Sequence, residues 1–335
     1  MYEFAAKIID WQKIHGRHDL PWQTKLNQAP DPYAIWVSEI MLQQTQVAAV
    51  IGYYDRFMRR FPNIRALSQA TQDEVLQYWS GLGYYSRARN LHNAAEKITD
   101  DFHGIFPQNF DDILSLPGIG KSTAAAISTF AFNQPMPILD GNVKRVFARY
   151  FGIEGWPGLP KIEQKMWGIA HRENPQDETV AYTQGLMDLG ATLCTRTKPK
   201  CGACPLQTSC AAYAKNLVQK LPTPKLRKAL PERECVMLVY MNANEVMLKK
   251  RANTGVWGGL WSFPETEKLP QIAKKLPAFT HTFTHFKLHI QPVMIFGSKP
   301  PDKPNTVWLT PDEALQAAIP TPVRKILLQI KNKAA

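Results

Sequence analysis

The sequence has no apolar run that approaches the roughly 18 residues needed to span a membrane. Its first twenty residues include acidic side chains and no apolar block, which argues against a signal peptide. Cysteine is also scarce, with 5 in 335 residues. We therefore expect a cytoplasmic protein without membrane contact. In that reducing compartment, clustered cysteines serve more often as metal ligands than as disulfides.

Acidic residues are too few to balance the basic ones, and the formal net charge is +12. From residue 221 onward there are 17 Lys and Arg against 8 Asp and Glu, whereas the preceding residues carry 23 against 20. An excess of this kind favours a polyanionic partner such as nucleic acid. A basic surface that only improves solubility is the alternative.

Alternating strand patterns are missing from the first 215 residues, where apolar residues recur at helical spacing. The Pro-rich and basic stretch KLPTPKLRKALPERE is typical of an extended linker. After it, CVMLVYM and EVMLKK flank a predicted hairpin turn, and TPDEALQAAI and PVRKILLQIKN have helical patterns. The sequence thus predicts an all-α domain over residues 1–218, a linker over 219–233 and a smaller α+β domain over 234–335.

Four of the five cysteines lie within 17 residues, CTRTKPKCGACPLQTSC, at residues 194–210. The spacing of Cys194, Cys201, Cys204 and Cys210 is x6, x2, x5, with a single C-x2-C pair. Zinc ribbons usually have two such pairs. Four thiolates on one compact loop suit a four-iron–four-sulfur cluster. Structural zinc and chance clustering are the alternatives.

The segment LSLPGIGKSTAAAISTF, residues 114–130, predicts a helix, a tight hairpin and a second helix. Gly118 and Gly120 allow a sharp turn and leave amide groups uncovered at the start of the second helix. Such amides can hold a phosphate oxygen. The pattern is that of a helix-hairpin-helix, which grips the DNA backbone without reading sequence. A plain helix end followed by a turn is the alternative.

Two carboxylates stand in positions suited to chemistry. Asp140, in LDGNVKRVFARYFG, lies at the start of a predicted amphipathic helix, whose dipole favours an ionised carboxylate. Glu39, in WVSEIMLQQTQV, is a lone acid in an apolar segment, where burial would raise its pKa. We expect one long helix in this segment, with Glu39, Leu42, Gln43 and Gln46 sharing a face. A helix cap and a solvated glutamate are the alternatives.

Together these motifs resemble the endonuclease III superfamily of DNA glycosylases. The superfamily shares the helix-hairpin-helix, the LDGN aspartate and the spacing of the cysteine loop, in this order. WVSEIMLQQTQV and GLGYYSRARN resemble its adenine-specific branch, the MutY adenine DNA glycosylases. The resemblance spans residues 2 to 225 and continues more weakly to the C-terminus. It implies base excision repair, in which adenine mispaired with 8-oxoguanine or guanine is removed from double-stranded DNA.

The resemblance also implies roles for individual residues and one four-iron–four-sulfur cluster. Glu39 would protonate the adenine ring, and Asp140 would stabilise the oxocarbenium-like sugar. The other implied roles are an adenine pocket, a wedge that enters the duplex, and support of the catalytic carboxylates. The residues are Trp22, Leu42 and Gln184 for the pocket, Gln43 and Tyr84 for the wedge, and Asn142 for the support.

Three features differ from the patterns of related proteins. Glycosylases that also cleave the strand carry a lysine where this chain has Ser122, and Lys121 should point elsewhere because one residue turns a helix by about 100°. The C-terminal domain resembles a Nudix fold without the Nudix metal-binding run, so we expect a recognition module. Phe283, Thr284 and His285 resemble the F-S-H loop with which the family senses 8-oxoguanine, with threonine in place of serine.

Three other functions fit parts of the sequence. A bifunctional glycosylase–lyase would need a lysine at Ser122. A non-catalytic DNA-binding protein with a structural metal leaves Glu39 and Asp140 unexplained. An electron-transfer protein explains the cysteines but not the hairpin or the carboxylates. Together with the resemblance, these mismatches favour a monofunctional adenine DNA glycosylase, which we expect to be a monomer.

Overall fold

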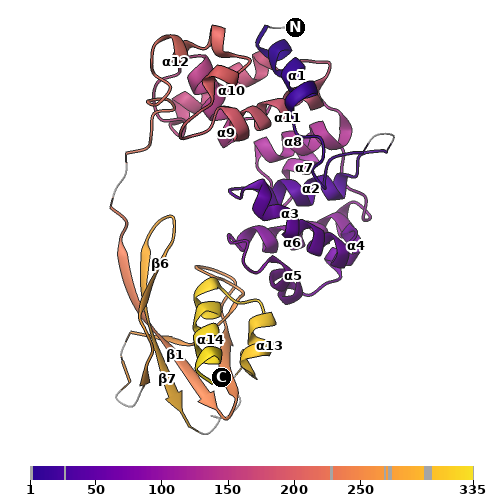
Figure 1. The fold of residues 1–335 in the computed structure, drawn as a ribbon. Coiled ribbons are helices and arrows are strands. Elements are labelled where there is room, and N and C mark those ends of the chain that lie inside the picture. The colour runs from indigo at the N-terminus through magenta and orange to yellow at the C-terminus, as the bar shows by residue number, and fades with distance from the viewer. Residues whose placement is uncertain are drawn as a thin grey trace. The chain divides into compact units, whose positions relative to one another are not determined.

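The computed structural model describes residues 3–25, 28–226, 229–267, 269–270, 274–297 and 304–334. The chain divides into two compact units, and the division is not a single cut. The first unit contains Met1–Arg65 and Asn93–Arg227. The second contains Ala66–His92 together with Lys228–Ala335. In Figure 1, helices account for the indigo to salmon part of the ribbon, and the sheet lies in the orange to yellow part.

Helices form all the regular structure of the described residues before residue 216, as the sequence predicts. The longer ones are α1 (Glu3–His15), α2 (Pro32–Leu42), α3 (Val47–Arg60), α5 (Gln72–Trp79), α6 (Ser86–Asp101), α8 (Lys121–Phe132), α9 (Gly141–Tyr150), α10 (Pro160–Glu173) and α11 (Thr179–Asp188). Short helices are α4 (Ile64–Ser68), α7 (Phe110–Leu114), η1 (Leu189–Leu193), η2 (Cys201–Ala203), η3 (Gln207–Ser209) and α12 (Ala211–Ala214). In the described part of the chain, no helix is both long and apolar enough to cross a membrane.

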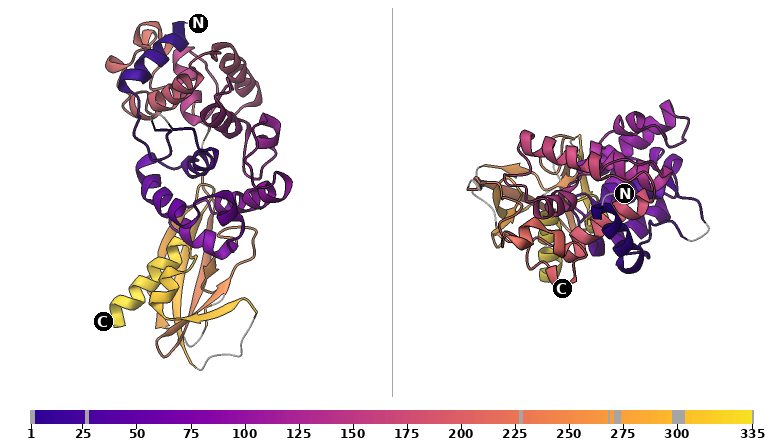
Figure 2. Two further views of the ribbon diagram at one scale, coloured as in Figure 1. Left: turned by 90° about the vertical axis from the view of Figure 1, so that its right-hand side faces the viewer. Right: turned by 90° about the horizontal axis from the view of Figure 1, so that it is seen from above.

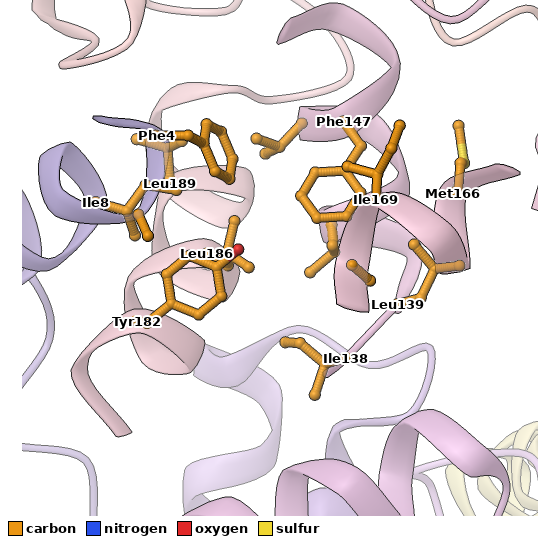
Figure 3. Packing of buried hydrophobic residues seen from close by; sticks show 14 of the residues in the cluster. Phe4, Ile8, Ile138, Leu139, Phe147, Met166, Ile169, Tyr182, Leu186 and Leu189 are labelled. Atoms are coloured by element: carbon orange, nitrogen blue, oxygen red, sulfur yellow. The ribbon is translucent and has the colours of Figure 1, made fainter. Parts of the chain in front are cut away.

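A buried apolar cluster in the first unit is built from α1, α8, α9, α10 and α11 (Figure 3). Phe4 of α1 packs edge-to-face on Phe147 of α9, with ring centroids 5.9 Å apart. Ile138 and Leu139, which directly precede Asp140, belong to the same cluster and are 2% and 3% exposed. Packing of these two side chains therefore fixes the backbone that enters α9.

The expected continuous helix through Gln46 is wrong, because the chain breaks between α2 and α3. Gln43 is the C-cap of α2, and Gln44 has a left-handed backbone with φ 57°. The turn is closed by a hydrogen bond from the Thr45 amide to the Leu42 carbonyl, at 3.2 Å. The polar run QQT ends one apolar helix and separates it from the next. Gln43 and Gln46 therefore do not share a helix face with Glu39.

The sheet of the second unit contains β1 (Glu232–Asn242), β2 (Glu245–Lys250), β3 (Trp261–Ser262), β4 (Glu265–Thr266), β5 (Lys274–Lys275), β6 (Phe279–Thr282), β7 (Lys287–Phe296) and β8 (Thr306–Leu309). β1 and β7 run parallel, from Glu232 beside Lys287 to Met241 beside Phe296, and β6 pairs antiparallel with β7. β1 and β2 form the expected hairpin. Helices α13 (Pro311–Gln316) and α14 (Thr321–Ala334), yellow in Figures 1 and 2, follow the last strand.

Residues 66–92 belong to the second unit, although the sequence places them among the helices of the first domain. Contacts made by α5 and α6 tie them to the C-terminal residues. Asp73 pairs with Lys250 at 2.6 Å, and the Arg89 guanidinium donates to the Gly258 carbonyl at 2.6 Å. Leu76 lies close to Gly259. The second unit thus combines a helical segment with the sheet domain.

Candidate active site and cysteine loop

Glu39 and Asp140 come from α2 and from the start of α9, and both are partly buried. Burial raises the pKa of Glu39 to about 8, and the negative charge of Asp140 contributes to this shift. A carboxyl group with this pKa holds its proton at neutral pH. The charge on Asp140 further disfavours ionisation of Glu39.

Asp140 caps α9, as the sequence predicts, and its carboxylate accepts a hydrogen bond from the Val143 amide at 2.7 Å. Burial nevertheless raises its pKa, and the amides of Val143 and Asn142, with the charges of Arg145 and Lys144, oppose that shift. The expectation that the helix start alone decides the ionisation of Asp140 is therefore incomplete. Its protonation depends on a balance between desolvation and these four groups.

Ser122 supports the segment that leads into Asp140. The Leu139 amide donates to its hydroxyl at 3.0 Å, which links α8 to the residue before the carboxylate. The neighbouring Lys121 turns its ammonium group over the ring of Trp167, 4.2 Å from the centroid. A lysine amine is thus directed onto α10, as a rotation of one helical residue predicts.

The predicted hairpin lies between α7 and α8. Gly118 has φ 81°, a left-handed conformation that glycine adopts readily. Gly120 has an ordinary φ of −96° and is the N-cap of α8, where an added Cβ would meet open space. Because Gly120 has no side chain to accept from the first amides of α8, these amides remain available to a phosphate oxygen.

The residues expected around adenine come from three segments. Trp22 is buried and packs edge-to-face on Tyr54 of α3, with centroids 5.3 Å apart. Leu42 ends α2, and Gln184 lies on α11. Gln43 points to the hairpin helix, where its amide donates to the Thr123 hydroxyl at 3.3 Å.

Sequence inspection did not identify Asp188, which organises this region. It is 1% exposed and accepts hydrogen bonds from the Arg17 guanidinium at 2.7 Å and from the Arg17 amide at 2.8 Å. The Gln184 amide nitrogen donates to the same carboxylate at 2.8 Å, which leaves its carbonyl oxygen as the acceptor. Gln23, next to Trp22, donates to the Arg17 carbonyl. One buried carboxylate therefore orients Gln184 and anchors the Trp22 turn.

The four cysteines of the loop line a single pocket and form no disulfides. Burial raises the pKa of Cys204 to about 11 and also raises that of Cys210. A bound cation is what would hold such thiols as thiolates. The donor set of four thiols and the surrounding apolar side chains, including Leu193 and Val218, therefore fit an iron–sulfur cluster. Arg196, Lys198 and Lys200 project from the loop and are exposed.

Helix α9 connects this loop to the Asp140 region through two arginines. Arg149 is 3% exposed and donates to the Cys194 sulfur at 3.3 Å and to the Thr195 carbonyl at 2.8 Å. Arg145 donates to the Cys194 carbonyl and to the Asn142 side chain, both at 2.7 Å. Asn142 is therefore held from the cysteine loop, two residues from Asp140.

Gly190 allows α9 and the π-turn η1 to approach closely. A Cβ on Gly190 would lie 2.6 Å from Cβ of Asn142 and 3.2 Å from its Cα. The Gly190 carbonyl also accepts from Arg145 at 2.7 Å. The small residue thus lets the backbone before Cys194 pack directly on the first turn of α9.

Tyr84 and the Phe283–His285 turn belong to the second unit. Phe283 stacks on Phe286, with centroids 4.5 Å apart, and its amide donates to the Phe286 carbonyl at 2.8 Å. Trp257 contributes a further ring 5.2 Å from Phe283. Thr284 and His285, by contrast, are exposed at the tip of the β6–β7 hairpin. Phe283 anchors the tip, and the two polar side chains remain accessible.

Comparison with protein families agrees with this geometry. The model of the HhH-GPD superfamily of base excision DNA repair proteins matches residues 37–172. The iron–sulfur binding domain of endonuclease III matches residues 194–210, and a NUDIX domain matches residues 235–329. The fold and the site therefore define a helix-hairpin-helix DNA glycosylase with an iron–sulfur loop and a C-terminal NUDIX-type domain.

Individual relatives narrow this class. The adenine DNA glycosylase of Buchnera aphidicola (strain APS) is 39% identical and covers 99% of this chain and 98% of its own. The human adenine DNA glycosylase is 31% identical, covering 96% of this chain and 73% of its own. The chain belongs to the adenine DNA glycosylase family. It is thus an enzyme that removes adenine in base excision repair, and its cysteine loop binds a four-iron–four-sulfur cluster.

Solved structures support the fold of the helical part. A thermostable thymine-DNA glycosylase matches with a TM-score of 0.57 and 31% identity, covering 63% of this chain and 95% of that one. A non-covalent endonuclease III–DNA complex matches with a TM-score of 0.53 and 20% identity, covering 64% and 95%. Both agree with the predicted helix-hairpin-helix fold.

Proposed function

We propose that the protein excises adenine paired with 8-oxoguanine or guanine, by hydrolysis alone and without cutting the strand. The observation that carries the proposal is the pair Glu39 and Asp140, in which burial raises the pKa of Glu39 to about 8 while Asp140 sits at a helix start. One carboxyl group can thus give a proton while the other carries charge, a division of roles common to enzymes that cleave glycosidic bonds.

In the proposed mechanism the adenine first leaves the base stack, since its glycosidic bond is inaccessible in the duplex. Glu39 donates its proton to the adenine ring, and the bond between the base and the sugar C1′ breaks. The Asp140 carboxylate stabilises the positive charge that develops on the sugar. Water then adds to C1′ and returns a proton to Glu39, which leaves an abasic site.

The contacts of Gln184, Asn142 and Ser122 agree with the auxiliary roles expected from the sequence. Gln184 presents its carbonyl oxygen because Asp188 holds its amide nitrogen, and an oxygen acceptor suits the amino group of adenine. The Ser122 hydroxyl accepts from the Leu139 amide just before Asp140, and the Asn142 side chain, two residues after Asp140, accepts from Arg145. The bound cluster would fix the cysteine loop through its thiolate bonds.

The absence of lyase activity is supported by the two residues at the start of α8. Ser122 offers a hydroxyl already bonded to the Leu139 amide, and the Lys121 amine lies over Trp167. A lyase needs an amine that attacks the sugar carbon and forms a Schiff base. We therefore propose that the product is an intact strand with an abasic site.

Recognition of the opposite base is proposed for the β6–β7 hairpin, with Tyr84 and Gln43 as the wedge. Thr284 and His285 are exposed polar side chains on an anchored turn, which suits a contact with a base edge. Exposed Arg196, Lys198 and Lys200 would contact DNA phosphates. One chain supplies both carboxylates, the hairpin and the cysteine loop, so we propose that a monomer acts on cytoplasmic, nucleoid DNA.

The test is single-turnover incubation with duplexes that carry adenine opposite 8-oxoguanine, guanine or thymine. We expect strand breaks only after hot alkali, and excision that is fastest opposite 8-oxoguanine. Glu39→Gln should retain mismatch binding and lose excision by about 10²–10⁴-fold, the usual contribution of a general acid. Strand cleavage without alkali at the rate of excision would reject the monofunctional mechanism, and equal rates on all three duplexes would reject the proposed substrate.

A further inference from the structure

Tyr84 lies on a short, tightly constrained loop between α5 and α6. Its own φ is 49°, and Gly81 and Gly83 on the same loop have φ 101° and 79°. The tyrosine side chain is 42% exposed. An exposed aromatic ring on a left-handed backbone is costly, so the surrounding structure must hold the loop in place.

Contacts within the helical segment account for one side of the loop. The indole of Trp79 and the guanidinium of Arg87 each donate to the Gly83 carbonyl at 3.1 Å. The same guanidinium lies 5.5 Å from the centroid of the Tyr84 ring. These contacts fix the C-terminal half of the loop, just before and at Tyr84.

The other half of the loop is held by the C-terminal domain. The Ser80 hydroxyl donates to the Ile319 carbonyl at 3.1 Å, and the Tyr85 hydroxyl donates to the same oxygen at 3.5 Å. The Tyr85 hydroxyl also accepts from the Gly81 amide at 3.3 Å. A chain of hydrogen bonds therefore runs from the loop backbone to a residue more than 230 positions away.

The acceptor has a fixed position. Ile319 is 1% exposed and lies between α13 and α14. The preceding Ala318 carbonyl accepts from the Trp261 amide of β3 at 2.8 Å, and the following Pro320 carbonyl accepts from the Arg324 amide of α14. The carbonyls on either side of Ile319 thus tie this segment to β3 and to α14.

We propose that the Ile319 carbonyl positions the Tyr84 loop, and that Ser80 and Tyr85 are positioning residues through which the C-terminal domain controls the wedge. The inference rests on the proposed function, in which Tyr84 enters the duplex beside the lesion. The C-terminal domain then contributes to excision in two ways. Thr284 and His285 contact the opposite base, while Ile319 sets the loop that opens the stack.

The test uses the full chain. The double variant Ser80→Ala with Tyr85→Phe is made in the wild-type background and in the Tyr84→Ala background. The control is Tyr240→Phe, which removes a tyrosine hydroxyl from β1 of the same domain. Duplexes carry adenine opposite 8-oxoguanine, with 2-aminopurine beside the 8-oxoguanine. The fluorescence of 2-aminopurine rises when its neighbour is unstacked. The measurements are this rise on binding and the single-turnover excision rate.

We expect the combined variant to show a smaller fluorescence rise and a slower excision, by about two- to tenfold per hydrogen bond lost. Ser80→Thr in place of Ser80→Ala keeps the hydroxyl and should restore most of the excision rate. In the Tyr84→Ala background the same two substitutions should add no further loss, because coupled residues are not additive. The control should match the wild type.

Two results would overturn the proposal. One is a combined variant that matches the wild type in both measurements. The other is an equal loss with and without Tyr84, which would mean that Ser80 and Tyr85 act only on general stability. Both leave the proposed function intact, because the wild type would still excise adenine opposite 8-oxoguanine. A wild type that does not excise it would overturn the proposed function and this inference together.

Discussion

Glu39 and Asp140 are similar acids whose different surroundings separate their behaviour. Glu39 lies on the apolar helix α2, and burial raises its pKa to about 8. Asp140 receives the Val143 amide and the charges of Arg145 and Lys144, which counter the effect of its burial. The sequence predicts the direction for Glu39 correctly because isolation among apolar residues has one outcome. For Asp140 it cannot, because two opposing effects depend on three-dimensional packing.

The raised pKa of Glu39 predicts the pH dependence of excision. A general acid must be protonated, so the single-turnover rate should fall as the pH rises through about 8. The measurement is a rate profile from pH 6 to pH 9.5 under matched salt. Glu39→Gln should give a low rate without this dependence. A wild-type rate that rises across the same range would exclude Glu39 as the acid.

Gly190 offers a second prediction at this scale. In Gly190→Ala the new methyl group would lie 2.6 Å from Asn142, and overpacking of this kind costs about 1–3 kcal/mol of unfolding free energy. Because Asn142 is two residues from Asp140, the excision rate should fall as well. Gly168→Ala is the matched control, since a Cβ there meets open space and should stabilise α10 slightly. A Gly190→Ala protein as stable and active as wild type would contradict the close packing.

Helix α9 connects Asp140 to the cysteine loop. Its first turn is capped by Asp140, and its two arginines bond to the loop that starts at Cys194. The sequence identifies the cap, the amphipathic face and the cysteine spacing. It does not identify these arginine contacts, because Arg145 and Arg149 are 45 or more residues away from their partners in the chain.

Arg149→Lys should weaken the cluster loop. Lysine keeps the positive charge but cannot reach the Cys194 sulfur, the Thr195 carbonyl and the Leu221 carbonyl together. Loss of such a supporting partner typically lowers metal affinity by about 10–100-fold. Purified wild type should contain about four iron atoms per chain, and the variant should lose iron faster to a chelator.

Three further variants serve as controls for the measurement of iron release. Cys204→Ala removes a cluster ligand and should give iron-poor protein, whereas Cys235→Ala on β1 should retain all its iron. Arg172→Lys, at a half-exposed arginine of α10, is the control for arginine replacement. Equal iron release from Arg149→Lys and Arg172→Lys would show that the Arg149 contacts do not support the loop.

The break between α2 and α3 shows where periodicity fails as a predictor. The apolar pattern continues from α2 into α3, so a single helix is expected from the sequence. The turn at Gln44 depends on a left-handed backbone that a glutamine adopts only because the turn is closed around it. Gln43 therefore reaches Thr123 on α8 from the end of a helix instead of from its face.

For the whole molecule, the domain organisation could be predicted more fully than the contacts between distant segments. The all-α part, the α+β part and the β1–β2 hairpin follow from local patterns. The association of residues 66–92 with the C-terminal residues does not, because it depends on single contacts such as Ser80 with Ile319 and Asp73 with Lys250. None of these has a signal in the spacing of residues along the chain.

The lesion preference should depend on the hairpin tip. Thr284→Ala combined with His285→Ala should lower the ratio of the excision rate opposite 8-oxoguanine to that opposite guanine. The loss of discrimination free energy should be about 1–3 kcal/mol if a base-edge contact is lost. Thr282→Ala, an exposed threonine of β6, is the matched control. The measurement is the ratio of single-turnover rates at one salt concentration. An unchanged ratio would show that the hairpin tip does not contact the lesion.

A chain that ends at Leu221 should lose more of the preference for 8-oxoguanine than this double variant does. It retains Glu39, Asp140, the hairpin and the cysteine loop, so slow excision opposite guanine should remain. It lacks Thr284 and His285, and it also lacks the Ile319 and Gly258 carbonyls that bind residues 80–89. A truncated chain with the full preference for 8-oxoguanine would assign lesion recognition to the remaining residues.

The discontinuous second unit has a consequence for synthesis. Residues 66–92 leave the ribosome long before residue 228, and at roughly 5–20 residues per second the interval is on the order of ten seconds. During this time the side chains of Ser80, Tyr85 and Arg89 have not yet met their carbonyl partners. The hydrogen bonds from these three side chains to the C-terminal carbonyls therefore form only after those residues have been synthesised.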